Sequence, residues 1–443
     1  MRIPRVMNMS GITLIRIALA LVLAVSKPVF AQSGVVRECT PQKIAEVMEP
    51  GSTQKPSVEV NCHLKLNPSS VVTKIITVTG DRANGTSIDC QGSVIKRFND
   101  SFGYNIDIRS EKVPNSEAWS RPENIVVKNC ELRSGIRVMG MAPHGQGAIL
   151  KESSFSQGHT ARAQANAPTR IELSNLNIFG SGYTPVYLSP GVTHVTMKDS
   201  NIQGWSNGAG VYLDAESAYN VFINNVIKVE TRRQGFFAVF REQVAIDGSA
   251  HNRFERNQIL DLKHGGIYLY RNCGEGGTVR HQPPINNLIM NNVFTFTNFR
   301  PANPAVHIAS RNALSLISIY MKVKHCHEED GYEFGSSTTN RDLAENNFII
   351  YNTFVKASPE EKIKTTTVLP NIIAKNVRVD EPTPAGTWLK PENMGCYVAN
   401  GDPVFVGHGG AVSRFKVNGV VQCTGEKLVC NAGNWAREQV LCN

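Results

Sequence analysis

The sequence has no block of lysine and arginine, and its excess of positive charge is small. Lys and Arg total 46 against 37 Asp and Glu, which gives a net charge of +9. Four of these positive charges lie in residues 1–31, which contain no acidic residue, so the rest of the chain carries +5. Nucleic-acid binders usually concentrate positive charge in a stripe or a tail. We therefore expect no nucleic-acid partner, and the mild excess is compatible with an acidic substrate.

Long hydrophobic runs are also missing. The apolar run Ile17–Val25 has nine residues, whereas a membrane-spanning helix needs about 20, and no later segment approaches that length. The run follows a basic stretch and precedes Val29-Phe30-Ala31, an arrangement typical of a secretory signal peptide. We predict cleavage after Ala31, no membrane span, and a secreted or periplasmic mature protein.

Cysteine spacing argues against structural zinc. None of the ten cysteines forms a Cys-x-x-Cys pair, which is the usual beginning of a tetrahedral zinc site. An even number of cysteines in an exported chain indicates disulfides instead. We predict a bond between Cys273 and Cys326 and pairing among the last four cysteines, which are Cys396, Cys423, Cys430 and Cys442.

What the sequence does contain is an internal repeat. Four segments align without a gap, and their first residues are 32, 35 and 60 positions apart: 220–227, 252–259, 287–294 and 347–354. Asn fills two columns of this alignment, and large apolar residues fill two others. The Asn columns are Asn220, Asn252, Asn287 and Asn347, and Asn225, Asn257, Asn292 and Asn352. Looser copies extend the pattern over roughly residues 85–380.

The repeat predicts a solenoid of short strands. Each unit combines β-branched runs with Gly, Asn and Asp turns, and no stretch shows a helical period. Stacked Asn side chains can bond their copies in the coils above and below, which satisfies buried polar groups. Ile, Val and Phe fill the apolar columns where a leucine-rich repeat would have Leu. We predict an all-β fold, a right-handed parallel β-helix.

On these residues the chain resembles the pectate-lyase-like β-helix superfamily, over roughly two-thirds of its length. The superfamily includes pectate lyases, polygalacturonases and mannuronan epimerases, so the resemblance implies action on a polysaccharide. The ordered Asn-x-Asp, Asp-Asp, His-Gly and Arg-x-Lys set of the polygalacturonases is absent, as is the Asp-Pro-His of the epimerases. Non-catalytic adhesins and tailspike shafts share the fold, so the fold alone does not define a function.

The repeat also divides the chain. After the signal peptide at 1–31, we expect an N-terminal cap and first coil over 32–85 and the β-helix proper over 86–382. Residues 383–443 are rich in Gly and hold four cysteines, so we expect a small C-terminal β module stapled by disulfides.

A second register of repeats predicts which strand face is outward. In segments such as 186–189, 211–216 and 244–249, alternate residues are apolar and must point inward. The residues between them form one outward column of Tyr187, Tyr212, Ala245, Tyr268 and His307, and a second of Ser189, Asp214, Asp247, Tyr270 and Ala309. Neighbouring coils lie about 4.7–4.9 Å apart, so Asp214 and Asp247 should stack with Glu216 beside them. An exposed tyrosine stripe next to acids suits a sugar chain.

Three mechanisms fit this patch, and the sequence leaves them open. Asp214 and Asp247 suit a retaining glycosidase, which uses carboxyls about 5–5.5 Å apart. A lyase or epimerase would use Tyr268 or Tyr270 with Arg271 for proton transfer. An inverting hydrolase would use a wider pair, Glu216 with Glu242.

The remaining predictions concern ligands. In the lyase or epimerase alternative, Asp214, Glu216 and Asp247 would hold Ca²⁺, which takes six to eight oxygen ligands. The expected substrate is a polysaccharide, and the charge and the Tyr/Arg mixture favour a uronate-containing one. The residues expected to bind it are Tyr187, Tyr212, His307, Arg241 and Arg311. The alternative to an enzyme is a β-helix that binds polysaccharide or is structural, without turnover.

Overall fold

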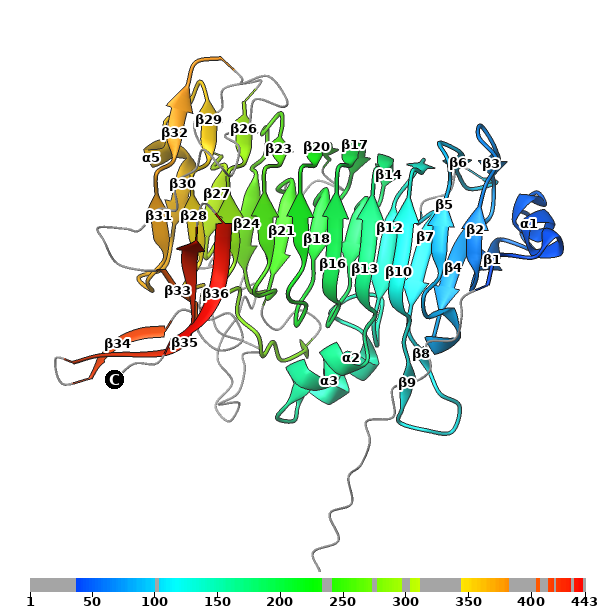
Figure 1. Ribbon diagram of the computed structural model, residues 1–443, viewed down its shortest axis with the longest axis horizontal. Coiled ribbons are helices and arrows are strands. Elements are labelled where there is room, and N and C mark those ends of the chain that lie inside the picture. Colours follow the sequence, from blue (N-terminus) through cyan, green and yellow to red (C-terminus); the bar gives the residue numbers. More distant parts are fainter. Residues whose placement is uncertain are drawn as a thin grey trace, which may run out of the picture. The chain divides into compact units, whose positions relative to one another are not determined.

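The structure, a computed structural model, describes residues 37–99, 103–232, 241–272, 277–296, 303–310 and 344–381, and the backbone of four strands between 404 and 440. From residue 57 onwards the chain winds through three parallel sheets of ten strands each (Figure 1). Each coil contributes one strand to each sheet in turn. This is the parallel β-helix that the repeat predicts.

The first sheet carries the outward face discussed below. Its strands, in spatial and sequence order, are β1 (Ser57–Glu59), β4 (Ile75–Thr79), β7 (Ile106–Arg109), β12 (Ile136–Met139), β15 (Val186–Leu188), β18 (Val211–Leu213), β21 (Val244–Asp247), β24 (Ile267–Tyr270), β27 (Val306–Ile308) and β30 (Ile363–Thr365).

The second and third sheets complete each coil. The second sheet consists of β2 (His63–Lys65), β5 (Ser87–Asp89), β10 (Glu123–Lys128), β13 (Thr169–Ser174), β16 (Thr193–Lys198), β19 (Val221–Ile223), β22 (Arg253–Glu255), β25 (Leu288–Met290), β28 (Phe348–Ile350) and β31 (Ile372–Ala374). The third consists of β3 (Val71–Val72), β6 (Val94–Ile95), β11 (Glu131–Leu132), β14 (Asn177–Gly182), β17 (Asn201–Ser206), β20 (Val226–Thr231), β23 (Gln258–Ile259), β26 (Val293–Thr295), β29 (Thr353–Val355) and β32 (Val377–Val379).

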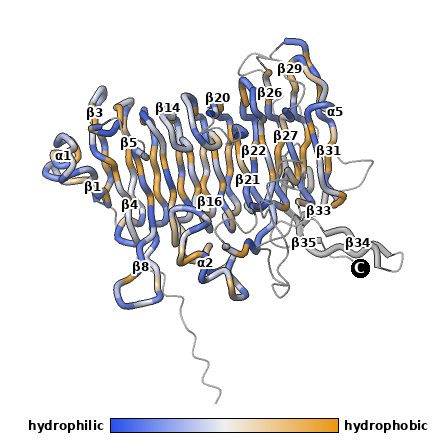
Figure 2. The backbone as a smooth tube through the Cα atoms, turned by 180° about the vertical axis from the view of Figure 1, so that it is seen from behind, coloured by the Kyte–Doolittle hydropathy of each residue, from blue (hydrophilic) through white to orange (hydrophobic). Residues whose placement is uncertain are grey.

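The core is built from the inward columns of the three sheets. In the first sheet every predicted inward residue from Val186 to Ile308 is fully buried. Apolar residues recur on the strands of successive coils (Figure 2). This stacking buries a continuous apolar column that no single coil could bury alone.

Both Asn columns form hydrogen-bonded ladders inside the turns. Asn220 Nδ2 donates to Asn252 Oδ1 at 3.1 Å, and the same bond continues through Asn287 and Asn347 to Asn371. The second ladder runs from Asn225 to Asn376 with every amide-to-amide distance at 3.0 Å. The predicted ladders are confirmed, and each gains one further rung.

The N-terminal region holds one helix followed by the first coil. The helix α1 (Pro41–Met48) precedes the coils, and β1, β2 and β3 make up the first of them. Two disulfides, Cys39–Cys62 and Cys90–Cys130, staple this end. The predicted bonds among the other cysteines lie outside the described residues.

Short elements interrupt the coils. They are the 3₁₀ turn η1 (Asp81–Ala83), the hairpin of β8 (Glu111–Lys112) and β9 (Trp119–Ser120), and the helices α2 (Ala148–Ser154), α3 (His159–Ala165) and α5 (Pro359–Lys362). The repeat predicted no helix, so α2 and α3 correct it: the thirty or so residues between β12 and β13 leave the solenoid and form a helical extension. Among the described residues no helix is long and apolar enough to span a membrane.

The C-terminal strands form a sheet of their own. Strands β33 (Val404–Val406), β34 (Ser413–Val417), β35 (Val420–Asn431) and β36 (Asn434–Val440) pair antiparallel, with β35 between β33 and β34 and also paired with β36. The backbone here is that of a small β module, as expected for this segment.

Candidate functional site

Successive strands of the first sheet align one outward residue per coil. The pairing gives the order Arg137, Tyr187, Tyr212, Ala245, Tyr268, His307 and Lys364. We call this set the outward column. Its predicted part, from Tyr187 to His307, is confirmed, and the structure adds Arg137 at one end and Lys364 at the other.

Two tyrosines of the outward column hold the two predicted aspartates. The Tyr187 hydroxyl donates to Asp214 Oδ2 at 2.6 Å, and the Tyr212 hydroxyl donates to Asp247 Oδ2 at 2.5 Å. Each phenol therefore bonds the acid of the next coil, and the two rings stack with centroids 5.3 Å apart. Burial raises the pKa of both phenols, which keeps them protonated as donors.

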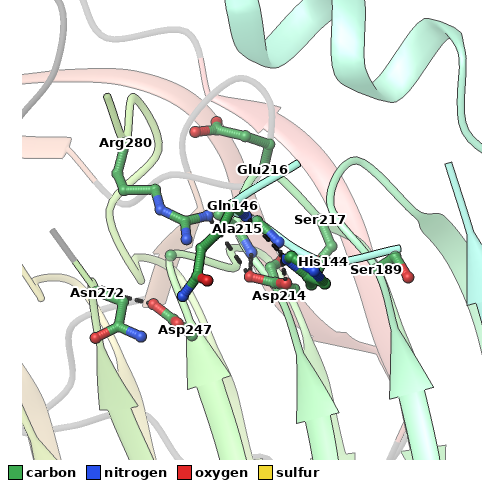
Figure 3. A network of polar contacts seen from close by, with 12 residues as sticks. His144, Gln146, Ser189, Asp214, Ala215, Glu216, Ser217, Asp247, Asn272 and Arg280 are labelled. Atoms are coloured by element: carbon green, nitrogen blue, oxygen red, sulfur yellow. Dashed lines mark hydrogen bonds and ion pairs between the residues drawn. The ribbon is translucent and has the colours of Figure 1, made fainter. Parts of the chain in front are cut away.

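Asp214 is enclosed by donors. Besides Tyr187, its carboxylate accepts the backbone N–H groups of Gly145 at 2.9 Å and Ala215 at 2.8 Å. The buried guanidinium of Arg280 lies 3.6 Å away and forms an ion pair with it (Figure 3). Only 3% of Asp214 is exposed, so its oxygens are already satisfied by the protein.

Asp247 is also fully buried. Beyond Tyr212, its Oδ1 accepts the backbone N–H of Asn272 at 2.6 Å. Burial raises the pKa of the Asp247 carboxyl to about 6, with the charge of Arg280 opposing the rise and that of Asp214 adding to it. The perturbation is the one expected of two acids sharing one cation in a dry environment.

Glu216 works as a clamp between three segments. Its carboxylate accepts the Thr160 hydroxyl of α3 and the backbone N–H groups of His281, at 2.9 Å, and Gln282, at 3.1 Å. The Glu216 backbone oxygen accepts Gln164 Nε2 at 2.9 Å. Glu216 therefore joins the end of β18 to α3 and to the segment after β24, and only 1% of it is exposed.

The helical extension and the segment 277–282 together cover the acids. The Val279 N–H donates to Ser154 Oγ at 3.0 Å, and His281 Nε2 bonds the Ser154 carbonyl at 2.7 Å. A Cβ at Gly145 would come within 2.2 Å of the Arg280 guanidinium, so the two covering segments also meet there. The prediction that Asp214, Glu216 and Asp247 face solvent is wrong, because these segments lie over them.

The three acids do not fit a calcium site. Asp214 and Asp247 accept from hydroxyls and backbone N–H groups and face the cation Arg280, while Glu216 is bonded to the covering segments. A Ca²⁺ ion needs several oxygens with lone pairs directed at one point. Among the described residues no group of three His, Cys, Asp or Glu side chains is arranged to hold a metal ion, which corrects the predicted metal set.

A second polar cluster lies at β21 and β24. The Tyr270 hydroxyl donates to Glu242 Oε1 at 2.8 Å and accepts from Arg241, whose guanidinium also pairs with Glu242 at 3.2 Å. Tyr270 is 1% exposed, so the prediction of an exposed Tyr270 is wrong. The Arg241 side chain is 22% exposed, and Glu242 is its partner.

His307 stands between Tyr268 and Lys364 in the outward column. Its ring meets Tyr268 edge to face, with centroids 5.3 Å apart, and its buried Nε2 has no hydrogen-bond partner among the described residues. Burial, with the charge of Lys364 adding, lowers the pKa of His307 to about 4. Burial and the Glu242 charge raise the pKa of Tyr268. At neutral pH the pair is a neutral imidazole and a neutral phenol.

Two predicted residues remain, Arg271 and Arg311. Arg271 follows β24, is 2% exposed, and donates from Nη1 to the Arg280 carbonyl at 3.4 Å, so it supports the covering segment. Arg311 lies outside the described residues.

A serine-hydrolase spacing also occurs, at Gly204-Trp-Ser-Asn-Gly208. Ser206, however, ends β17, is fully buried, and donates its hydroxyl to the Ala209 carbonyl at 3.2 Å. The nucleophile of such a motif must be exposed on a strand-to-helix turn, and here strand leads to strand. This serine is structural.

Comparison with known proteins agrees with this architecture. The family profile described as "Right handed beta helix region" matches residues 65–318, more than half of the chain. The chain belongs to the right-handed β-helix family. No curated protein matches this β-helix.

Several solved structures resemble this β-helix at low identity. An alginate lyase from Paenibacillus sp. str. FPU-7 is 11% identical, with a TM-score of 0.32 over 73% of this chain and 85% of the lyase. The periplasmic alginate epimerase AlgG is 11% identical, with a TM-score of 0.38 over 71% of this chain and 63% of the epimerase.

Proposed function

We propose that this β-helix is an exported polysaccharide lyase that acts on a uronate-containing chain along the outward column. The observation that carries the proposal is the pair His307 and Tyr268, with the unpartnered Nε2 of His307 beside a phenol on one strand face. Export rests on the leader in the sequence. The substrate class rests on the chemistry of the pair and of its cationic neighbour.

His307 suits the role of general base. Removal of the C5 proton of a uronate needs a neutral base whose lone pair is not already bonded. The pKa of His307, lowered to about 4, keeps the imidazole neutral at physiological pH. Its Nε2 is buried and bonds no described residue, so its lone pair is not committed to any group in the described part of the chain.

Tyr268 suits the role of general acid. Its raised pKa keeps the phenol protonated, and it stands one coil from His307 on the same sheet face. In the elimination, His307 takes the C5 proton, the C4–O bond breaks, and Tyr268 gives its proton to the leaving oxygen, which leaves a C4=C5 double bond. Because base and acid approach from one side, this geometry favours elimination over epimerisation, which needs proton delivery to the opposite face of the ring.

A cation beside His307 can neutralise the uronate carboxylate. Lys364 is exposed and pairs in register with His307, whereas the partly exposed Arg241 is already paired with Glu242. A cation that binds the uronate carboxylate makes the C5 proton more acidic, because it stabilises the negative charge that develops on the carboxylate in the transition state. A neutral sugar has no carboxylate for a cation to bind, so the positive charge beside His307 favours an acidic substrate.

The hydrolase alternatives have less support. Both glycosidase mechanisms need two carboxyl groups that reach the glycosidic bond. Asp214, Asp247 and Glu216 are each at most 3% exposed and bonded to protein donors. Glu242 is engaged by Arg241 and Tyr270.

The test is an assay of the purified protein on polygalacturonate, alginate and a neutral galactan, with and without a chelator. We expect ultraviolet absorbance of unsaturated uronate from an acidic polymer, unchanged by chelation, and none from the galactan. His307→Ala and Tyr268→Phe should remove it. His194→Ala is the matched control, since His194 lies in β16 of the second sheet, stacks on Tyr219 and also has a lowered pKa.

Other outcomes of this assay would replace the proposal. Reducing ends without unsaturated product would establish a hydrolase. Binding without any product would establish the non-catalytic alternative. A changed uronate epimer composition without cleavage would establish an epimerase.

A further inference from the structure

A cavity of about 420 Å³ opens beside the first coils, at the edge where the third sheet turns into the first. Its polar lining consists of Lys96, Arg97, Asn99, Asn105, Arg133, Ser134 and Ser181. The volume lies within the range of small-ligand sites, about 300–1,000 Å³. None of these residues takes part in the site described above.

The lining is positively charged and holds an unused donor. Lys96, Arg97 and Arg133 supply three cations, of which Arg133 is paired with Glu131 and Arg97 also has a contact of its own. Asn105 is fully buried: its Oδ1 accepts the N–H groups of Ser134 at 2.6 Å and Gly135 at 3.1 Å, whereas its Nδ2 bonds none of the residues that the structure describes. A buried amide donor without an acceptor is costly, and an anion in the cavity would satisfy it.

The turn that forms this cavity also reaches the outward column. Tyr104, next to Asn105, lies under the guanidinium of Arg137 at 4.9 Å, and its ring stacks on that of Tyr183 at 5.9 Å. Tyr183 is 53% exposed. An exposed aromatic ring beside a cationic cavity can stack on a sugar ring while the cavity takes its acidic group.

We propose that this cavity is a distal binding site for an acidic sugar residue of the same polysaccharide chain. It takes the carboxylate at Lys96, Arg97 and Asn105 Nδ2. The inference rests on the proposed function for the identity of the chain. From β7 to β24 there are five coil steps, about 24 Å at the usual spacing between strands, so a chain that occupies both sites must be several residues long.

The consequence is a dependence on chain length. A short acidic oligosaccharide reaches only the Tyr268 and His307 end, whereas a long one engages both sites and gains affinity from the second through a high effective concentration. Loss of the distal site should therefore raise KM for long chains, leave kcat unchanged, and leave short substrates unaffected.

The experiment measures binding by titration calorimetry in a His307→Ala background, so that turnover plays no part. The probes are a long oligogalacturonate or oligomannuronate, the trisaccharide of the same series, and inorganic sulfate. The test variant is Lys96→Gln with Arg97→Gln. The control is Lys65→Gln with Lys128→Gln, which removes the same charge from an exposed and a partly exposed position on the second sheet.

We expect the test variant to bind the long oligosaccharide about ten-fold more weakly, as loss of charge-assisted hydrogen bonds implies, and the control to bind as before. Asn105→Asp should show the same loss, because the new carboxylate keeps the acceptor to Ser134 and Gly135 but repels an anion. Its melting temperature serves as the check on folding. Equal affinities in the test and control variants would overturn the inference, as would tight binding of sulfate alone that the long chain does not displace.

The two proposals fail separately. If no polymer yields product but the test variant loses long-chain binding, the lyase proposal is wrong and the distal site stands. If product forms and KM for long chains is unchanged in the same substitutions made without His307→Ala, the distal site is wrong and the lyase proposal stands.

Discussion

The first sheet presents two kinds of outward residue, and they differ in how far the described residues satisfy their hydrogen-bonding atoms. Around Asp214 and Asp247 the helical extension and the segment 277–282 exclude solvent, and every acid is bonded to protein donors. Around His307 the imidazole has an unbonded nitrogen beside a protonated phenol. The perturbed acids here therefore belong to a structural network, whereas the proposed reaction uses the groups left with unused bonding capacity.

The largest expected effect separates these two regions directly. His307→Ala should lower kcat for an acidic polymer about a thousand-fold, the contribution of a well-placed general base, with the melting temperature unchanged. Initial rates of unsaturated product measure it. A rate within ten-fold of the wild type would show that the reaction does not take place at the outward column.

The reverse behaviour is expected at the clamp. Glu216→Gln places an amide N–H₂ against donors from α3 and from residues 281–282, so it should lower the free energy of unfolding by about 3 kcal/mol, as loss of a buried charged acceptor does. Urea unfolding measures the change, and limited proteolysis of the 140–168 extension should accelerate. An unaltered unfolding curve would contradict the clamp.

Asp247→Asn tests whether the buried acids are catalytic. The Asn side chain can keep the bond from the Asn272 N–H and donate to the Tyr212 oxygen, so we expect a folded variant that retains turnover within ten-fold. The pKa of Asp247 is raised in the folded state, so folding binds a proton between about pH 4 and pH 6, and wild-type stability relative to the variant should fall by roughly 2–3 kcal/mol as pH rises through that window. Denaturant titrations at pH 4 and pH 7 check this. Loss of turnover would restore the acid-based mechanism.

The smallest expected effect concerns the acid limb of the pH–rate profile, where kcat/KM falls at low pH. The base acts in its neutral form, so kcat/KM should be flat near neutral pH and fall as pH drops through about 4, the pKa of His307. The Lys364 charge lowers that pKa, so Lys364→Gln should move the limb upward, by less than about one pH unit because Lys364 is exposed and screened. A pH–rate profile of both proteins measures the shift. A limb that stays in place would exclude His307 as the group that titrates.

The sequence predicted the scaffold because the scaffold is local and periodic. Alternation in strands such as 211–213 sets which residues point inward, and the Asn columns repeat coil by coil, so both could be read from the chain and both are confirmed. Outward direction was predictable on the same ground. The exposure of these outward side chains to solvent was not predictable, because it depends on segments that leave the repeat and lie over the strand face.

The missed residues belong to those segments. Arg280 contacts Asp214, and Thr160 contacts Glu216, each across about 60 residues of sequence. No local sequence pattern predicts such a contact. The extension at 140–168 did carry a signal, since 148–154 and 159–165 are rich in Ala and other helix formers. His307 was placed in the correct column but assigned to substrate binding, because the unbonded state of its Nε2 appears only in the structure.

The Asn ladder also separates the length of the chain from the geometry of the stack. Asn287 bonds Asn347 at 3.0 Å across 60 residues of sequence, as closely as other rungs bond across far fewer. Because the entropic cost of closing a loop grows only slowly with its length, coils of this solenoid can accept or lose long insertions at such a junction. The scaffold can thus stay constant while loops are exchanged, which makes this junction a natural point for grafting new recognition segments.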